Sequence, residues 1–315
     1  MSQFLFSLNV IAPMVMYLVI GYGLRKAKII DDHFIRVGNT FTFYVTLPIL
    51  LFNSFTTVTL DHGLDLSFVG YILVSMIIYN AFGWWYIKRH PRLEQHQKGA
   101  SALSMVRGNV LVFGYPLVAG LYGGAGNLEM ALTGAFTAPL SALLAAMLLS
   151  YFAPVAKKKT FGPLILSFLL NPLVLAAVLG FVFKLLNITI PTLVMDVFNP
   201  IGAMATPFAL IILGGSFRFT GFLHQLKQIF GIITWKMIIS PIVLLAIAIA
   251  LGFRSYELAC ILAVVATPNA VSNYAMTAEM NSDAKIAGDS IVVSVLIAPF
   301  TLFLFVYIFL LLGWL

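Results

Sequence analysis

The sequence contains very little charge for its length. Only 9% of its 315 residues are Asp, Glu, Lys or Arg, whereas 61% are hydrophobic, and the mean hydropathy is +1.01. A soluble domain has about a quarter of its residues charged, so a soluble globular fold is excluded. Apolar runs of about 20 residues recur along the chain, and each can cross the hydrocarbon core as a helix. The composition therefore indicates an integral, multi-pass membrane protein.

Cysteines and catalytic signatures are also scarce. Cys260 is the only cysteine, so no disulfide can form within the chain, and its thiol is expected to serve in packing. The sequence has no G-x-x-x-x-G-K-[ST] phosphate loop, no H-E-x-x-H zinc motif and no G-x-S-x-G nucleophile elbow. The histidines show no metal spacing. We therefore expect no enzyme, no ATP-driven pump within this chain, no metal site and no cofactor.

Ten transmembrane helices can be assigned from the apolar runs. They cover about 5–24, 35–56, 66–87, 99–122, 128–152, 163–186, 194–216, 228–252, 256–278 and 285–313. Loops after the odd-numbered spans hold most of the lysines and arginines, whereas the opposite loops hold only Lys184 and Arg254. Because basic loops stay in the cytoplasm, both termini are predicted to lie outside. Membrane orientation thus accounts for the net charge of +7, and no nucleic-acid partner is expected.

The two halves of the chain carry matching prolines, glycines and polar residues. At one spacing Pro13 matches Pro172, Gly21 matches Gly180 and Pro48 matches Pro207; one residue further on, Asn109 matches Asn269, Glu129 matches Asp289 and Pro139 matches Pro299. Five is an odd number of spans, so the second copy must be inverted. The sequence predicts an all-α fold of two inverted five-helix repeats, residues 1–153 and 163–315, joined by a short basic cytoplasmic loop at 154–162. Such repeats are typical of secondary transporters.

The fourth and ninth spans are poor continuous helices. The fourth contains Gly108, Gly114 and Pro116, and the ninth contains Pro268 among Thr267, Asn269, Ser272 and Asn273. A broken helix frees backbone groups that lipid cannot satisfy, so each break must face protein or a watery cavity. Two breaks at corresponding positions of two repeats indicate a substrate site near the bilayer midplane. Half-helix N-termini at such a site favour an anion.

Charged and polar side chains within the spans are candidates for ligand contact. Arg107 suits a carboxylate, although it could instead reach the interface or a backbone carbonyl, and Lys236 has the same two interpretations. Glu129 and Asp289 either take part in proton coupling or complement the dipoles of the helices they begin. The other candidates for substrate binding are Gly108, Asn109, Gly114, Tyr115, Pro116, Pro268, Asn269, Ser272, Asn273 and Asn53, with structural hydrogen bonding or packing as the alternative.

Several motifs resemble those of the auxin efflux carrier family, which includes bacterial malonate and malate permeases and the plant PIN-formed carriers. The segment "RGNVLVFGYPL" is similar to that family's Asn…Gly-x-Pro break, and "TPNAVSNYAMTAEMNSDAKIAG" is similar to its second break. The segments "TLPILLFNSF" and "TPFALIILGGSF" resemble its paired proline-bearing spans. The resemblance covers essentially the whole chain.

The resemblance implies a scaffold of spans 1, 2, 6 and 7 and a mobile transport domain of spans 3–5 and 8–10. The broken spans would cross near Pro116 and Pro268–Asn269. It also implies elevator-type alternating access for a small organic anion, a mono- or dicarboxylate such as malonate or malate. Such permeases are often homodimers, and a bacterial cytoplasmic (inner) membrane is expected. Span 3 lacks acidic and basic residues, which favours a small acid over auxin. A sodium-coupled carrier of the bile-acid type and a non-transporting membrane sensor remain alternatives.

Overall fold

The computed structural model describes residues 2–56, 67–123, 127–153, 170–217 and 226–315. Helices and π-helical turns make up most of this described part, which contains no β-strand beyond one isolated bridge. The prediction of an all-α protein is confirmed for these ranges. The predicted loop at 154–162 and the first residues of the sixth predicted span, 163–169, lie outside the described residues.

Within the described residues, seven helices are long and apolar enough to cross a membrane. Five of them are single helices: α1 (Ser2–Lys26), α4 (Ser67–Arg89), α7 (Asn127–Phe152), α10 (Thr192–Gly215) and α15 (Ala284–Leu311). Shorter apolar helices occupy Val110–Tyr122, Pro172–Leu185 and Ser255–Val265, within the fourth, sixth and ninth predicted spans. The total of ten spans stays a prediction.

Two of the seven long helices contain a π-helical turn. One consists of α2 (Asp32–Phe41), η1 (Thr42–Thr46) and α3 (Leu47–Thr56), and the other of α11 (Leu226–Thr234), η5 (Trp235–Ile239) and α12 (Ser240–Ala250). Each turn is followed at its second next residue by a proline, Pro48 or Pro241. Proline has no backbone N–H, so the regular bond to the preceding turn is lost and the helix widens there. The second of these turns, η5, carries Lys236.

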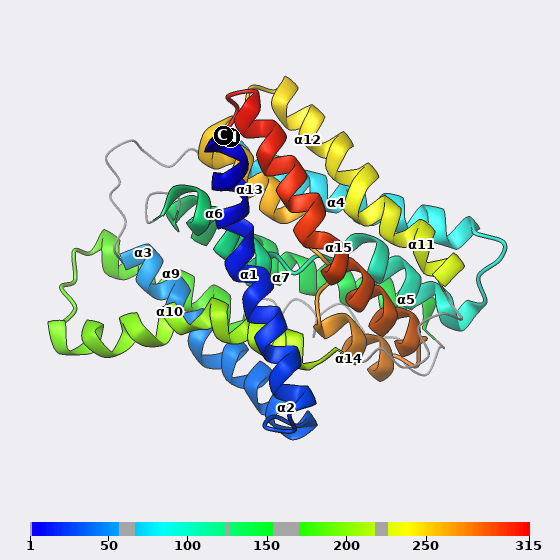
Figure 1. Cartoon of the computed structure of the whole chain (residues 1–315), viewed down its shortest axis with the longest axis horizontal. Coiled ribbons are helices and arrows are strands. Elements are labelled where there is room, and N and C mark those ends of the chain that lie inside the picture. Colours follow the sequence, from blue (N-terminus) through cyan, green and yellow to red (C-terminus); the bar gives the residue numbers. More distant parts are fainter. Residues whose placement is uncertain (1, 57–66, 124–126, 154–169, 218–225) are drawn as a thin grey trace.

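Glycines allow α1, α10, α3 and α9 (Pro172–Leu185) to pack in close pairs (Figure 1). A Cβ atom at Gly21 of α1 would lie 1.9 Å from the carbonyl oxygen of Ile211 in α10. A Cβ atom at Gly180 of α9 would lie 2.8 Å from the carbonyl oxygen of Phe52 in α3. Any larger residue would push these helix pairs apart, because no side chain atom fits at such distances.

The two ends of the chain lie together where α1 and α15 pack against each other (Figure 1). The side-chain amide of Gln3 donates a hydrogen bond of 3.0 Å to the carbonyl of Leu310. This contact places both termini at the same end of the molecule.

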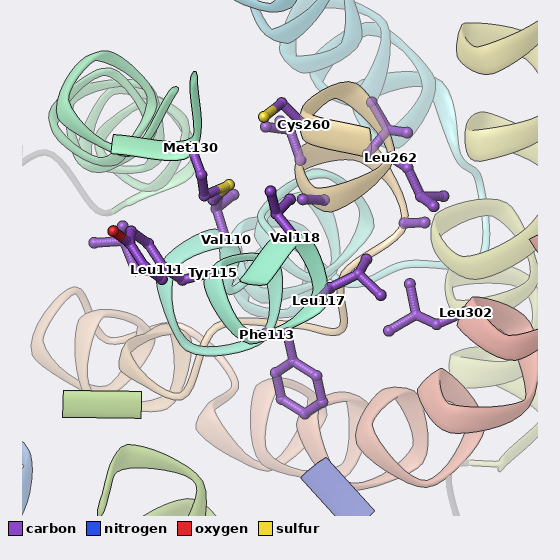
Figure 2. Close-up of a cluster of buried hydrophobic side chains, with 14 of the residues drawn as sticks. Val110, Leu111, Phe113, Tyr115, Leu117, Val118, Met130, Cys260, Leu262 and Leu302 are labelled. Carbon is purple, nitrogen blue, oxygen red and sulfur yellow. The ribbon is translucent and has the colours of Figure 1, made fainter. Parts of the chain in front are cut away.

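The second half of the fourth predicted span, from Val110 onward, lies within the largest hydrophobic core. Figure 2 shows Cys260 and Leu262, Met130 of α7 and Leu302 of α15 gathered around the helix that carries Val110 to Val118. Cys260 is fully buried there, so its predicted packing role is confirmed. This core fixes the positions of the two interrupted helices described next.

Candidate functional site

The fourth predicted span is interrupted at residues 107–109. Helix α5 (Gln95–Val106) ends at Arg107, whose backbone is extended with φ −96° and ψ 115°. Asn109 is also non-helical, with φ −99° and ψ 67°, and the chain then resumes as η2 (Val110–Gly114) and α6 (Tyr115–Tyr122). The Arg107 N–H still donates to the Leu103 carbonyl of α5, and the Asn109 carbonyl accepts from Phe113 of η2, but the Asn109 N–H has no partner in either helix.

The ninth predicted span is interrupted in a similar way. Helix α13 (Ser255–Val265) ends at Ala266, and α14 (Ser272–Glu279) begins after the segment 267–271. Pro268 lies in this gap, where its missing N–H and fixed φ angle prevent the helix from continuing. The gap is buried, since Thr267 and Asn269 have no exposed surface.

The two interruptions cross and satisfy each other's backbone groups. Gly108 and Asn269 form an isolated antiparallel bridge, and the backbone N–H of Asn109 donates to the carbonyl of Pro268 over 2.8 Å. The backbone N–H of Asn269 donates to the hydroxyl of Ser294 over 3.0 Å. These bonds supply the partners that a broken helix lacks in lipid. We call residues 107–109 and 267–269 the crossing.

The predicted position of this crossing is right for one segment and wrong for the other. Pro268 and Asn269 form it as expected, but their partners are Gly108 and Asn109 instead of Pro116. Pro116 lies in the first turn of α6. This helix continues from η2 without a break, so Pro116 follows a π-helical turn in the same way as Pro48 and Pro241. Its missing N–H widens the helix there without interrupting it.

Arg107 extends from the crossing toward α7 and α14. Its Nε donates to Ser141 over 3.2 Å, and its Nη1 donates to Ser272 over 2.7 Å and to Asn273 over 2.8 Å. Its Nη2 makes no hydrogen bond within the described part of the chain. No acidic side chain among the described residues pairs with this guanidinium, so its charge is met only by neutral groups.

Lys236 approaches the same place from η5. Its side chain is only 1% exposed, and its Nζ lies 5.8 Å from the ring centroid of Tyr79. A Cβ atom at Gly108 would lie 3.1 Å from this Nζ and 2.7 Å from the hydroxyl oxygen of Thr267. The ammonium group therefore packs directly against the backbone of the crossing.

A small cavity of about 30 Å³ connects the two cations. Its polar lining consists of Arg107, Lys236, Ser75, Tyr79, Asn80 and Ser141, and its other lining residues are apolar apart from Gly108. This volume holds about two water molecules.

Tyr79, Asn80, Ser75 and Ser141 were not identified from the sequence. Tyr79 donates to the carbonyl of Met105 at the end of α5 and accepts from Ser240 over 3.0 Å. The adjacent Tyr79 and Asn80 in an otherwise apolar span were the one signal that could have indicated this lining.

Other predicted residues also meet at the crossing. Asn269 is fully buried, and neither its side-chain oxygen nor its nitrogen has a hydrogen-bond partner in the described part of the chain. The Nδ2 of Asn273 is likewise buried without a partner among the described residues, although its oxygen binds Arg107. Asn109 is half-buried beside them.

Three predicted residues make their contacts elsewhere. Asn53 donates to Asn199 over 3.2 Å and so links α3 to α10. The hydroxyl of Tyr115 shares a hydrogen bond of 2.5 Å with Ser54 and links α6 to α3. Gly114 packs closely against Ala263 of α13. These contacts join neighbouring helices. For Asn53 and Tyr115 they match the alternative to substrate binding, which was structural hydrogen bonding or packing.

Glu129 and Asp289 lie near the starts of α7 and α15. Glu129 is in the first turn, as predicted, whereas Asp289 is one turn further into its helix than the first turn and only 8% exposed. One carboxylate oxygen of each is buried without a partner within the described ranges.

A family model described as a membrane transport protein matches residues 6–162 and 159–306, nearly the whole chain. The chain belongs to this family of membrane transport proteins. This match supports the auxin efflux carrier resemblance of its motifs. The protein is therefore an integral, multi-pass membrane protein of a transporter family. No curated protein matches the chain.

Proposed function

We propose that this transporter is a secondary active permease that moves a small organic anion, a mono- or dicarboxylate such as malonate or malate, through the crossing. The observation that carries the proposal is Arg107, a cation at the crossing with no acidic partner among the described residues. Ionisable side chains within membrane spans mark substrate pathways when they face a cavity. A carboxylate would supply the missing counter-charge.

The donors around Arg107 fit a carboxylate in geometry as well as in charge. Its Nη2 makes no hydrogen bond to the described part of the chain, and guanidinium groups bind carboxylates with parallel N–H donors. Two half-helices, η2–α6 and α14, begin at the crossing, and the positive ends of their dipoles favour an anion there. The amides of Asn109 and Asn269 would add neutral donors and acceptors. Gly108, Ser272 and Asn273 would complete the site.

The helix arrangement supports the proposed ten spans and inverted repeats. Gly21, in the first predicted span, packs on the seventh; Gly180, its match in the sixth, packs on the second. This reciprocal packing is what two inverted copies would produce. The two termini lie at the same end of the molecule, as they must if the chain crosses the membrane an even number of times.

The small cavity supports alternating access by an elevator-type movement. Two water molecules occupy much less space than a three- or four-carbon acid, so the cavity would have to widen before such an acid could bind both cations. Substrate would enter when the transport domain, made of α4–α7 and α11–α15, moves against a scaffold of α1, α2, α3, α9 and α10. We further propose a bacterial cytoplasmic (inner) membrane location and a homodimer. The mechanism needs no cofactor, and Glu129 and Asp289 are the candidates for proton coupling.

Uptake into proteoliposomes tests the proposal. Purified wild-type protein would be assayed with labelled malonate, malate and other small acids, with and without proton and sodium gradients, beside Asn109→Ala and the exposed-site control Arg36→Gln. We expect saturable uptake of at least one acid that Asn109→Ala impairs and Arg36→Gln preserves. Uptake that requires sodium would favour the bile-acid type of carrier. Folded protein that moves no acid under any gradient would overturn the proposal and favour a non-transporting sensor.

A further inference from the structure

Lys236 is a second cation in the site, held there by local helix geometry. It lies in η5, the π-helical turn ahead of Pro241, and packs with 1% exposure. The ammonium group lies over the ring of Tyr79, 5.8 Å from its centroid, and approaches Gly108, but no acceptor among the described residues binds it. A buried ammonium normally requires an acceptor, because burial without one forfeits its hydration.

No acid in the described part of the chain neutralises either cation. The ion pairs of these residues join Arg25 to Asp32 and place His96 near Glu94 and Asp283, all away from the crossing. The cavity lining contains Arg107 and Lys236 but neither Asp nor Glu. The site therefore carries two positive charges and no negative one.

These two charges have different consequences for monoanions and dianions. A monoanion that binds Arg107 leaves Lys236 buried without a counter-charge. A dianion neutralises both groups, and coulombic attraction is stronger at a site removed from water. An ammonium is a compact point charge that suits a single carboxylate, whereas a guanidinium suits bidentate contact.

We propose that Lys236 determines the charge selectivity of this transporter: it binds the second carboxylate of a dianion whose first carboxylate binds Arg107. This inference rests on the proposed function, since it concerns the same site. It makes dicarboxylates the preferred substrate class and monocarboxylates poor substrates. Gly108 permits this contact, because a side chain at that position would occupy the space beside the ammonium group.

The test compares malonate with malonamate, in which an amide replaces one carboxylate at nearly constant size. Binding is measured first, by ligand titration of purified protein followed through its thermal unfolding temperature, since a ligand stabilises the state that it binds. Uptake of the two labelled compounds is measured separately. The variants are Lys236→Met, which removes the charge, and Lys236→Arg, which keeps it. Lys26→Met is the matched control at an exposed position.

We expect wild-type protein and Lys26→Met to prefer malonate over malonamate by about tenfold or more, the value of a hydrogen bond between charged groups. In Lys236→Met this ratio falls to near one through loss of malonate affinity, while Lys236→Arg keeps a preference. Loss of a charge without a partner should not prevent folding, and the unfolding temperature of each variant without ligand confirms this.

An equal ratio in folded Lys236→Met and wild-type protein overturns the inference, as does a wild-type protein that binds both compounds equally. If wild-type protein shows the Lys236-dependent preference in binding but transports neither acid, the transport proposal fails and the charge assignment stands. If folded wild-type protein binds neither malonate and malonamate nor succinate and succinamate, the proposed function and the role of Lys236 are both overturned.

Discussion

The backbone N–H of Asn109 donates to the carbonyl of Pro268 over 2.8 Å, and this bond joins two helices that are each interrupted inside the hydrophobic part of the protein. It shows why the interruptions persist: each break provides the hydrogen-bond partner that the other lacks. The same contact brings Arg107, at the end of one broken helix, beside Ser272 and Asn273 of the other. The interruptions of the two helices thus lie where Arg107, a cation without an acidic partner among the described residues, lines a cavity.

The crossing requires a glycine at position 108. In Gly108→Ala the new Cβ would lie 2.7 Å from the Thr267 hydroxyl oxygen and 3.1 Å from the Lys236 Nζ, so the two segments must shift. We expect the uptake rate to fall about tenfold or more, because misplacement by about an ångström is costly in a preorganised site. The matched control is Gly70→Ala, whose Cβ meets nothing within 4 Å. Equal uptake by the two variants would contradict the role given to Gly108.

The close contact of α1 with α10 predicts a large stability difference within one helix. Gly21→Ala would place a Cβ atom 1.9 Å from the carbonyl oxygen of Ile211, and overpacking of this kind costs about 1–3 kcal/mol. Gly23→Ala meets nothing within 4 Å and should be neutral or slightly stabilising. Thermal unfolding in the same detergent measures both. Similar unfolding temperatures for the two variants would show that the helices are not packed this closely.

The hydroxyl of Tyr79 is expected to stabilise the end of α5. It donates to the Met105 carbonyl and accepts from Ser240, so Tyr79→Phe leaves both groups without this partner. We expect a loss of about 1 kcal/mol in the free energy of unfolding. Tyr86→Phe is the control, since Tyr86 is 44% exposed. A Tyr79→Phe variant as stable as this control would show that the Tyr79 hydroxyl does not stabilise the end of α5.

Asn53 is expected to serve stability and not substrate affinity. Its amide donates to Asn199 and links α3 to α10, and interhelical hydrogen bonds in membranes contribute about 0.6 kcal/mol on average. Asn53→Ala should therefore unfold at a slightly lower temperature and keep the KM for uptake within about twofold, in contrast to Asn109→Ala. A tenfold rise in KM for Asn53→Ala with unchanged stability would show instead that Asn53 contributes to substrate binding.

The sequence was sufficient to predict an all-helical membrane protein and the two broken spans, because glycine, proline and asparagine inside apolar runs cannot continue a regular helix. It was less informative about where the first break lies. Pro116 is the stronger sequence signal, yet the π-helical turn η2 accommodates it within the helix Val110–Tyr122. The break occurs at Gly108, where only the close approach of a second segment requires glycine. That approach depends on tertiary structure.

The lining of the site was only partly predictable for the same reason. Arg107 and Lys236 stood out as charges in apolar spans, but their common cavity follows from how α4, η5 and the crossing pack. Ser75 and Ser141, which also line the cavity, are ordinary residues of membrane helices when seen in sequence. Asn53 and Tyr115 were polar residues at promising positions, and the helix packing gives them partners elsewhere.

The most direct test of the central claim is the initial rate of labelled malonate uptake by Arg107→Gln relative to Arg36→Gln. If the Arg107 guanidinium holds a carboxylate of the substrate, its removal should lower uptake roughly a hundredfold, as expected when one partner of a buried charge pair is lost. Arg36→Gln, altered at an exposed position, should retain the wild-type rate. Equal uptake by the two folded variants would contradict the claim that this crossing binds the transported anion.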